Sequence, residues 1–171
     1  MKKRAVKTDY RRRMKLLKSG LPRLVIRKTN RYIIGMIVEY SPSGDRTSKL
    51  ITSKSLKKYG WELGLKNTPA AYLTGFLIGK TGGVKEAIVD KGRHTMSKGS
   101  FIRYFIKGAL DAGMDLHVKE MDIDKERMVG KHILDYYSKD SSKFSELGDK
   151  IKLITDEFNK VIEKINQENG R

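Results

Sequence analysis

The spacing of the hydrophobic residues changes near Thr52, and this change restricts the chain to an α/β fold class. Before Thr52, short runs of β-branched and aromatic residues are separated by turn-forming segments at 28–31 and 41–45. Such runs are typical of strands. We therefore expect a three-strand antiparallel meander, with strands at 24–26, 32–38 and 46–52.

Helical spacing alternates with short strands in the next part of the chain. Leu56, Tyr59 and Trp61 predict a short helix, and Asn67 followed by Pro69 predicts the start of a second helix, over 69–80. A strand at 86–90, a helix over about 102–110 and a strand at 114–118 follow. Because strands joined through helices pair in parallel, we expect a mixed β-sheet with helices on its faces.

The chain divides by composition into three parts: a basic extension (1–22), an α/β core domain (23–119) and a helical C-terminal region (120–171). In the last part, apolar residues recur at steps of 4, 3, 4, 3 and 4, which predicts one stripe on a single helix. The stripe consists of Leu147, Ile151, Ile154, Phe158, Val161 and Ile165. It is expected to dock on the core or on a partner.

The net charge of +17 is concentrated at the N-terminus. Residues 1–60 carry 18 basic and 3 acidic side chains, whereas residues 115–171 carry 11 and 13. This asymmetry predicts a polyanionic partner, and the alternative is a solvated surface that only keeps the chain soluble. Self-repulsion in segment 1–20 predicts that most of it stays unstructured until a polyanion neutralises it, apart from a short helix over about 9–18.

The candidate RNA contacts lie in the extension and in the first hairpin. The planar guanidinium group of arginine can donate two parallel hydrogen bonds to phosphate oxygens, while tyrosine and asparagine add a stacking surface and further hydrogen bonds. A smaller basic group precedes the helix over 102–110, whose N-terminus favours anions. The complete set is Tyr10, Arg11, Arg12, Arg13, Lys15, Lys18, Arg23, Arg27, Lys28, Asn30, Arg31, Lys98 and Arg103.

Other chemistry finds little support in the sequence. The segment from Gly75 to Thr81 resembles a phosphate-binding loop, but it has one residue too few between its glycines and ends a predicted helix. The three histidines lack ligand spacing, and there is no cysteine. We expect no catalytic residue, no metal site and no cofactor, with magnesium only as an RNA counterion. We also expect no membrane span, no small-molecule substrate and a cytoplasmic location.

Several ordered blocks resemble a known family. The segment from Tyr10 to Arg31 is similar to the opening of the archaeal 5S-rRNA-binding protein of the large ribosomal subunit, the ribosomal protein eighteen family. Later blocks of that family are matched in the same order, and the resemblance covers roughly residues 5 to 137. These blocks are Tyr59 to Trp61, Thr68 to Gly75, Glu86 to Asp90 and Lys107 to Asp115.

The resemblance implies a structural constituent of the large (50S) ribosomal subunit. Such a protein binds 5S rRNA, contacts 23S rRNA and neighbouring ribosomal proteins, and helps to attach the 5S particle at the central protuberance. It also implies a ribonuclease-H-like topology without catalytic function, a ribosome-bound state, and RNA contacts concentrated in the basic extension and the first hairpin.

Two alternatives remain open at the level of the sequence. The first is an RNA nuclease of ribonuclease-H-like topology, which would need clustered carboxylates, one of them on the opening strand. That strand has no acidic residue, and only Asp90 and Asp111 remain as candidates. The second is a non-ribosomal adaptor that binds a partner through the stripe from Leu147 to Ile165.

Overall fold

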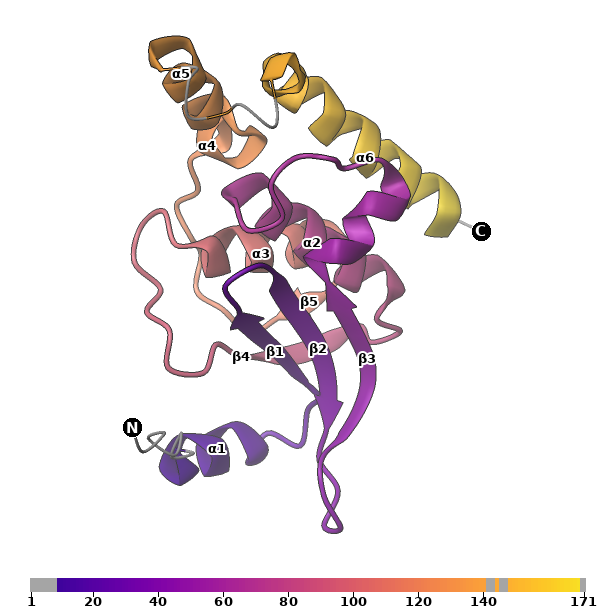
Figure 1. Cartoon of the computed structure of the whole chain (residues 1–171). Helices are drawn as coiled ribbons and strands as arrows, with labels where there is room; N and C mark the ends of the chain where they lie inside the picture. The colour runs from indigo at the N-terminus through magenta and orange to yellow at the C-terminus, as the bar shows by residue number, and fades with distance from the viewer. Residues whose placement is uncertain (1–8, 141–143, 145–147, 170–171) are drawn as a thin grey trace, which may run out of the picture.

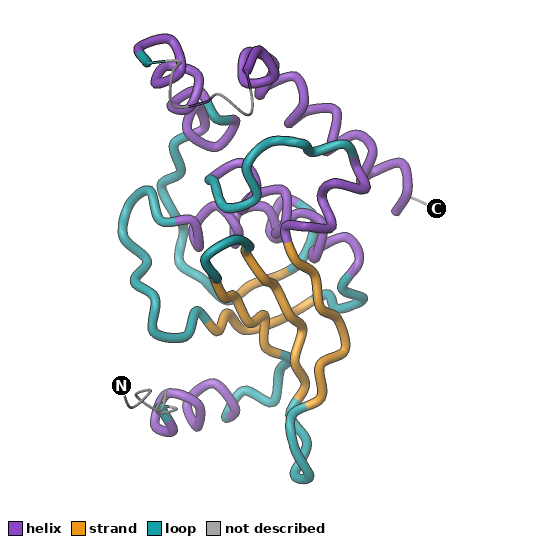
Figure 2. The backbone as a smooth tube through the Cα atoms, viewed as in Figure 1, coloured by secondary structure: helices purple, strands orange, loops and turns teal. Residues whose placement is uncertain are grey.

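The computed structural model describes residues 9–140, 144 and 148–169. Its centre is a five-stranded mixed sheet with the strand order β3-β2-β1-β4-β5, and helices lie behind and beside the sheet (Figures 1 and 2). The expected α/β class with a mixed sheet is therefore confirmed.

The first three strands form the predicted antiparallel meander. β1 (Arg23–Lys28) pairs with β2 (Ile33–Glu39), and β2 pairs with β3 (Arg46–Thr52). The turn between β1 and β2 is closed by Thr29, whose hydroxyl oxygen accepts hydrogen bonds from the amides of Arg31 and Tyr32 at 3.3 and 2.9 Å. Local turn chemistry thus places the tip of the hairpin where the sequence predicts it.

The last two strands pair in parallel, as expected for strands that follow helices. β4 (Glu86–Asp90) lies beside β1, and β5 (Asp115–Leu116) lies beside β4. β5 is shorter than the predicted 114–118 segment. The amide of Val118 bonds to the carbonyl of Leu116 at 2.6 Å, so the chain turns out of the sheet there.

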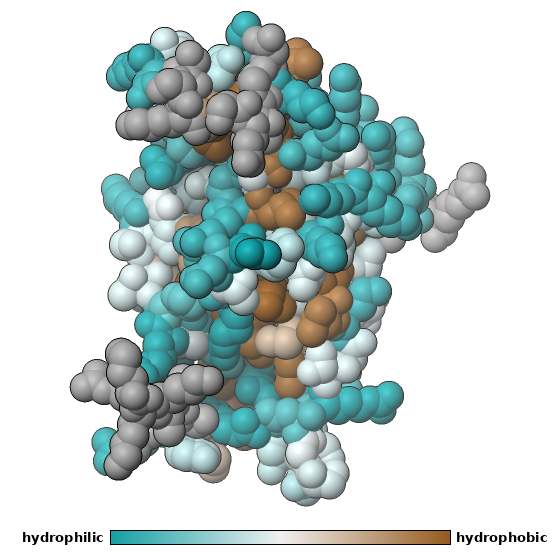
Figure 3. All heavy atoms as spheres, in the orientation of Figure 1, coloured by the Kyte–Doolittle hydropathy of each residue, from teal (hydrophilic) through white to brown (hydrophobic). Residues whose placement is uncertain are grey.

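The two central helices, α2 (Thr68–Thr81) and α3 (Phe101–Asp111), lie on the same face of the sheet. β3, β4 and β5 run parallel to one another, and the chain crosses the sheet in a single direction from β3 through β4 to β5. Right-handed crossover connections therefore place α2 and α3 on the same side of the sheet. The sequence predicted helices on the faces of the sheet without saying which face each helix covers, and the structure places this pair on one face. The opposite face exposes apolar atoms at its centre (Figure 3), and Leu50 of β3 is 57% exposed.

Glycines set the close approach of α2 to α3. A Cβ atom at Gly75 would lie 1.9 Å from the carbonyl oxygen of Phe105, and one at Gly108 would lie 2.1 Å from that of Tyr72. Both distances are far below van der Waals contact. The segment that resembles a phosphate-binding loop is therefore a helix-packing seam inside α2.

The C-terminal region packs on the same hydrophobic core. It comprises α4 (Lys125–Val129), α5 (Lys131–Lys139), the 3₁₀ helix η3 (Gly148–Leu153) and α6 (Ile154–Asn169). A further 3₁₀ helix, η1 (Ser53–Tyr59), stands where the first short helix was predicted. The apolar stripe faces inward, and its members are at most 2% exposed: Ile151, Ile154, Phe158, Val161 and Ile165.

This packing corrects the expectation of a single helix and confirms that the stripe docks on the core. It is not carried by one helix, because Ile151 belongs to η3 and only the later members belong to α6, while Leu147 lies outside the described residues. The described members of the stripe are also covered by the chain's own core. They offer no surface to a partner, which contradicts the adaptor alternative.

Candidate nucleic-acid interface

The helix α1 (Tyr10–Leu17) has two distinct faces. Its N-cap is Asp9, whose carboxylate accepts a hydrogen bond from the amide of Arg12 at 3.1 Å. The inward face holds residues that are partly buried, namely Arg12, Arg13, Leu16 and Leu17. The outward side and the C-cap position hold exposed residues, namely Tyr10, Arg11, Met14, Lys15 and Lys18. The predicted helix is present, and residues 1–8 of the extension lie outside the described residues.

Both inward arginines of α1 bind other parts of the chain. The Nη2 atom of Arg13 lies 2.9 Å from Oδ1 of Asp45, in the turn between β2 and β3. Arg12 donates a hydrogen bond from Nη1 to the carbonyl oxygen of Gly92, just after β4. These contacts tether α1 to two loops that are distant in sequence.

The arginines of β1 continue this network. Arg23 is 4% exposed, and its Nη2 atom lies 2.6 Å from Oδ2 of Asp45. Its Nη1 atom is 3.8 Å from Oδ2 of Asp90, which also lies 3.2 Å from Nη2 of Arg27. Arg13, Asp45, Arg23, Asp90 and Arg27 thus form a chain of alternating charges, which we call the arginine–aspartate chain.

The pKa of Asp45 reflects this environment. Burial on its own raises the pKa of the carboxyl group, but the hydrogen bonds and positive charges of Arg23 and Arg13 outweigh it, so the pKa lies below the ordinary value of 3.8. Asp45 is therefore ionised at neutral pH, and it holds both guanidinium groups by charge-assisted hydrogen bonds.

The tip of the β1–β2 hairpin forms a second cationic group, at the opposite end of the sheet from α1 (Figure 1). Lys28, Asn30 and Arg31 are exposed there. The Nζ atom of Lys28 lies 4.8 Å from the centre of the Phe101 ring, a cation–π contact that places the tip beside the start of α3. The hairpin tip and the basic group at α3 are thus neighbours.

The basic group at α3 is shared with carboxylates. The Nζ atom of Lys98 lies 3.5 Å from Oδ2 of Asp122, and both side chains are well exposed. A hollow of about 430 Å³ is lined by these two residues together with Arg103, Asp124 and Arg127. No pattern in the sequence indicated that acidic residues from the segment before α4 would meet Lys98 and Arg103.

The loop between β4 and α3 links the two cationic groups. It is held by Arg12 of α1 at Gly92, and it ends at Ser100, beside the hairpin tip. It carries Lys91 and the exposed Arg93, which were not among the predicted contacts. The pattern Lys-Gly-Arg directly after a strand was the available signal. We define the cationic edge as seven exposed or half-buried cations along this path, leaving out Lys98 because it pairs with Asp122: Arg11, Lys15, Lys18, Lys91, Arg93, Lys28 and Arg31.

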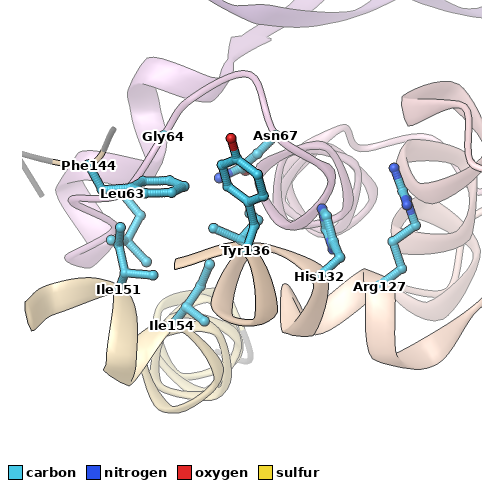
Figure 4. Close-up of a pocket in the computed structure, with 10 residues that line it drawn as sticks. Leu63, Gly64, Asn67, Arg127, His132, Tyr136, Phe144, Ile151 and Ile154 are labelled. Atoms are coloured by element: carbon cyan, nitrogen blue, oxygen red, sulfur yellow. The ribbon is translucent and has the colours of Figure 1, made fainter. Parts of the chain in front are cut away.

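An apolar pocket of about 520 Å³ lies apart from these cations, between the segment at 63–67 and the C-terminal helices (Figure 4). Its lining includes Tyr136, Phe144 and Ile154, with Arg127 as its one cation among the described residues. Burial, assisted by the charge of Arg127, lowers the pKa of His132 on its wall. Such a lining does not suit a polyanion.

The two carboxylates that a nuclease would need are already engaged. Asp90 pairs with Arg27 and Arg23, and it accepts a hydrogen bond from the amide of Gly92 at 2.8 Å. The carboxylate of Asp111 accepts hydrogen bonds from the hydroxyl of Tyr72 at 2.9 Å and from Nζ of Lys107 at 2.5 Å. Across the residues that the structure describes, no three His, Asp or Glu side chains converge as a metal site. Within the same residues, no helix has both the length and the apolar character needed to cross a bilayer.

The sequence of this chain is similar to those of known proteins. Residues 1–86 match the model of a family described as the ribosomal large subunit proteins 60S L5 and 50S L18. A large ribosomal subunit protein uL18 from Korarchaeum cryptofilum is 42% identical, covering 96% of this chain and 91% of that protein. The protein of the same name from Halobacterium salinarum is 43% identical, covering 79% of this chain and 76% of that protein.

Proposed function

Because the chain belongs to the family of the ribosomal large subunit proteins 60S L5 and 50S L18, we propose that it is a structural constituent of the 50S subunit that binds 5S rRNA. In this proposal it also contacts 23S rRNA and neighbouring large-subunit proteins, and it helps to attach the 5S particle at the central protuberance. It acts in the cytoplasm as part of the ribosome. A catalytic role has no place in the proposal, and magnesium serves only as an RNA counterion.

The observation that carries the proposal is the cationic edge. Its cations belong to α1, the loop after β4 and the hairpin tip, so an RNA backbone that follows the edge meets positive charge over the full length of the sheet. Each neutralised phosphate releases condensed counterions, which favours binding at low salt. The α/β core then orients these groups, and it is proposed to be a ribonuclease-H-like scaffold without catalytic function.

Not all of the predicted arginines are equally available to phosphates. Arg11 and Arg31 are exposed, whereas Arg12, Arg13 and Arg23 already have partners within the chain. We therefore assign the direct phosphate contacts to the cationic edge. Tyr10 and Asn30 remain proposed as stacking and hydrogen-bonding groups beside it.

A salt titration of the full chain with 5S rRNA tests the proposal, with tRNA and an unrelated duplex as competitors. Neutralising about six to eight phosphates lowers the affinity by roughly a thousandfold or more between about 50 and 200 mM salt. We expect tRNA to compete poorly, and the RNA to stay intact in magnesium. Equal affinity for the three RNAs, or binding that ignores salt, would overturn the proposal.

A further inference from the structure

Asp45 is an unexpected acidic residue, because it lies beside α1 in the most basic third of the chain. It is one of only three acidic residues in the first 60 positions, together with Asp9 and Glu39. A carboxylate here opposes the binding of a polyanion by simple Coulomb repulsion. Asp45 nevertheless holds one arginine on each of its two oxygens, which indicates a role within the chain.

The two tethers of α1 lead back to the same rigid part of the sheet. Arg13 is held by Asp45, which in turn is held by the buried Arg23 of β1. Arg12 is held by the carbonyl oxygen of Gly92, whose amide donates to Asp90 at the end of β4. Because β1 and β4 are paired in the sheet, both tethers fix α1 relative to one rigid unit.

Fixing the inward arginines also fixes what the helix presents to solvent. Arg11, Lys15 and Lys18 follow one another at steps of four and three, so they form one stripe on the side away from Arg12 and Arg13. A helix that could turn or detach would present these cations in many orientations. Ordering it on binding would then lower the affinity.

We propose that Asp45 is a positioning residue that docks α1 on the sheet before RNA arrives, so that Arg11, Lys15 and Lys18 form a prearranged phosphate-binding stripe. This inference rests on the proposed function, because it names how one element of the cationic edge is made ready. Asp45 and Arg13 act through the helix that they hold, and Arg13 does not contact a phosphate.

The test separates positioning from charge. The variant Asp45→Asn removes a negative charge, which by itself strengthens the binding of any polyanion. The matched control is Glu39→Gln, which removes a negative charge from an exposed position in the same third of the chain. We expect Glu39→Gln to bind 5S rRNA as tightly as the unaltered chain or more tightly, and Asp45→Asn to bind about tenfold more weakly. Asp45→Glu keeps the carboxylate and is expected to restore much of the loss.

Hydrogen exchange of the full chain without RNA provides a second readout. The amides of residues 13–17 donate the backbone hydrogen bonds of α1. We expect these amides to exchange at least about tenfold faster in Asp45→Asn than in the unaltered chain, but not in Glu39→Gln. Peptides from β1 and β4 should stay protected in both variants. Faster exchange restricted to α1 shows that Asp45 docks this helix.

A third variant addresses the role of Arg13 directly. If Arg13 is a tether, Arg13→Gln lowers the affinity but leaves the salt dependence unchanged. If Arg13 contacts a phosphate, the slope of log affinity against log salt falls by about 0.9, as expected for the loss of one charge. The second result overturns the inference.

The outcomes also separate this inference from the proposed function. If the unaltered chain does not prefer 5S rRNA, the proposed function fails, and the inference fails with it as a statement about RNA binding. If the unaltered chain binds well and Asp45→Asn binds as tightly as Glu39→Gln, only the inference fails. Unchanged exchange of α1 in Asp45→Asn also overturns the inference.

Discussion

The rings of Tyr72 in α2 and Phe158 in α6 lie 5.4 Å apart, centre to centre. Through this contact the C-terminal helix becomes part of the core of the α/β domain, although the two residues are 86 positions apart in sequence. Aromatic pairs at this distance add to the stabilisation that burial already provides. The C-terminal helix therefore supports the platform that presents the cationic edge.

The substitution Phe158→Ala tests this contact. Phe158 is 2% exposed, so removing its ring leaves a cavity and should lower the free energy of unfolding by about 3–5 kcal/mol. Chemical denaturation followed by Trp61 fluorescence measures the effect. The exposed neighbour Asn159→Ala is the control and should change the stability by less than about 0.5 kcal/mol. An equal effect of both substitutions would show that α6 is not part of the core.

The substitution Gly75→Ala tests the packing seam between α2 and α3. The added Cβ atom would meet the backbone carbonyl of Phe105 at 1.9 Å, and backbone atoms cannot rotate away. We expect the free energy of unfolding to fall by about 2–3 kcal/mol or more. Urea denaturation measures this fall, and its midpoint should move to a lower urea concentration. Gly64→Ala is the control, because its Cβ atom meets only the side-chain amide of Asn67 at 3.2 Å. If Gly75→Ala is as stable as this control, the two helices are not held at this distance.

Acid should release α1 from the sheet. The pKa of Asp45 is lowered in the folded chain, so its stabilising contribution is complete above the ordinary value of 3.8 and is lost as the pH falls through the lowered folded value. Chemical shifts of the Cα atoms of residues 10–17, recorded from pH 6 to pH 2.5, report the loss of helix. Trp61 emission reports whether the core remains folded.

The same acid titration of Asp45→Asn serves as the comparison. Asp9, which caps α1, is retained in this variant. The difference between the two titrations therefore belongs to Asp45. Identical titrations would mean that Asp45 does not hold the helix.

The exposed cations on the outward side of α1 should determine part of the salt dependence of 5S rRNA binding. Replacing Arg11 and Lys15 together by Gln removes two exposed cations and should lower the slope of log affinity against log salt by about 1.8. The control pair, Lys150 and Lys152 of η3, lies outside the cationic edge and should leave the slope unchanged when replaced by Gln. A similar change from both pairs would show that only the total charge matters.

Much of the fold could be predicted because its determinants are local. The span of β3 at Arg46–Thr52 and that of β4 at Glu86–Asp90 agree with the observed strands, since β-branched runs and turn residues lie next to one another in the chain. The C-terminal stripe was harder to interpret. Apolar spacing identifies which residues are buried, but it does not distinguish a 3₁₀ turn followed by a helix from a single helix.

The sequence by itself determined where positive charge is concentrated and which segments form strands and helices, because both depend on neighbouring residues. Only the tertiary structure decided which arginines remain available. Arg13 and Arg23 meet Asp45 across 32 and 22 positions, and Arg12 meets Gly92 across 80. Pairing of charges depends on distance in space, and in this chain the folding of the sheet sets that distance.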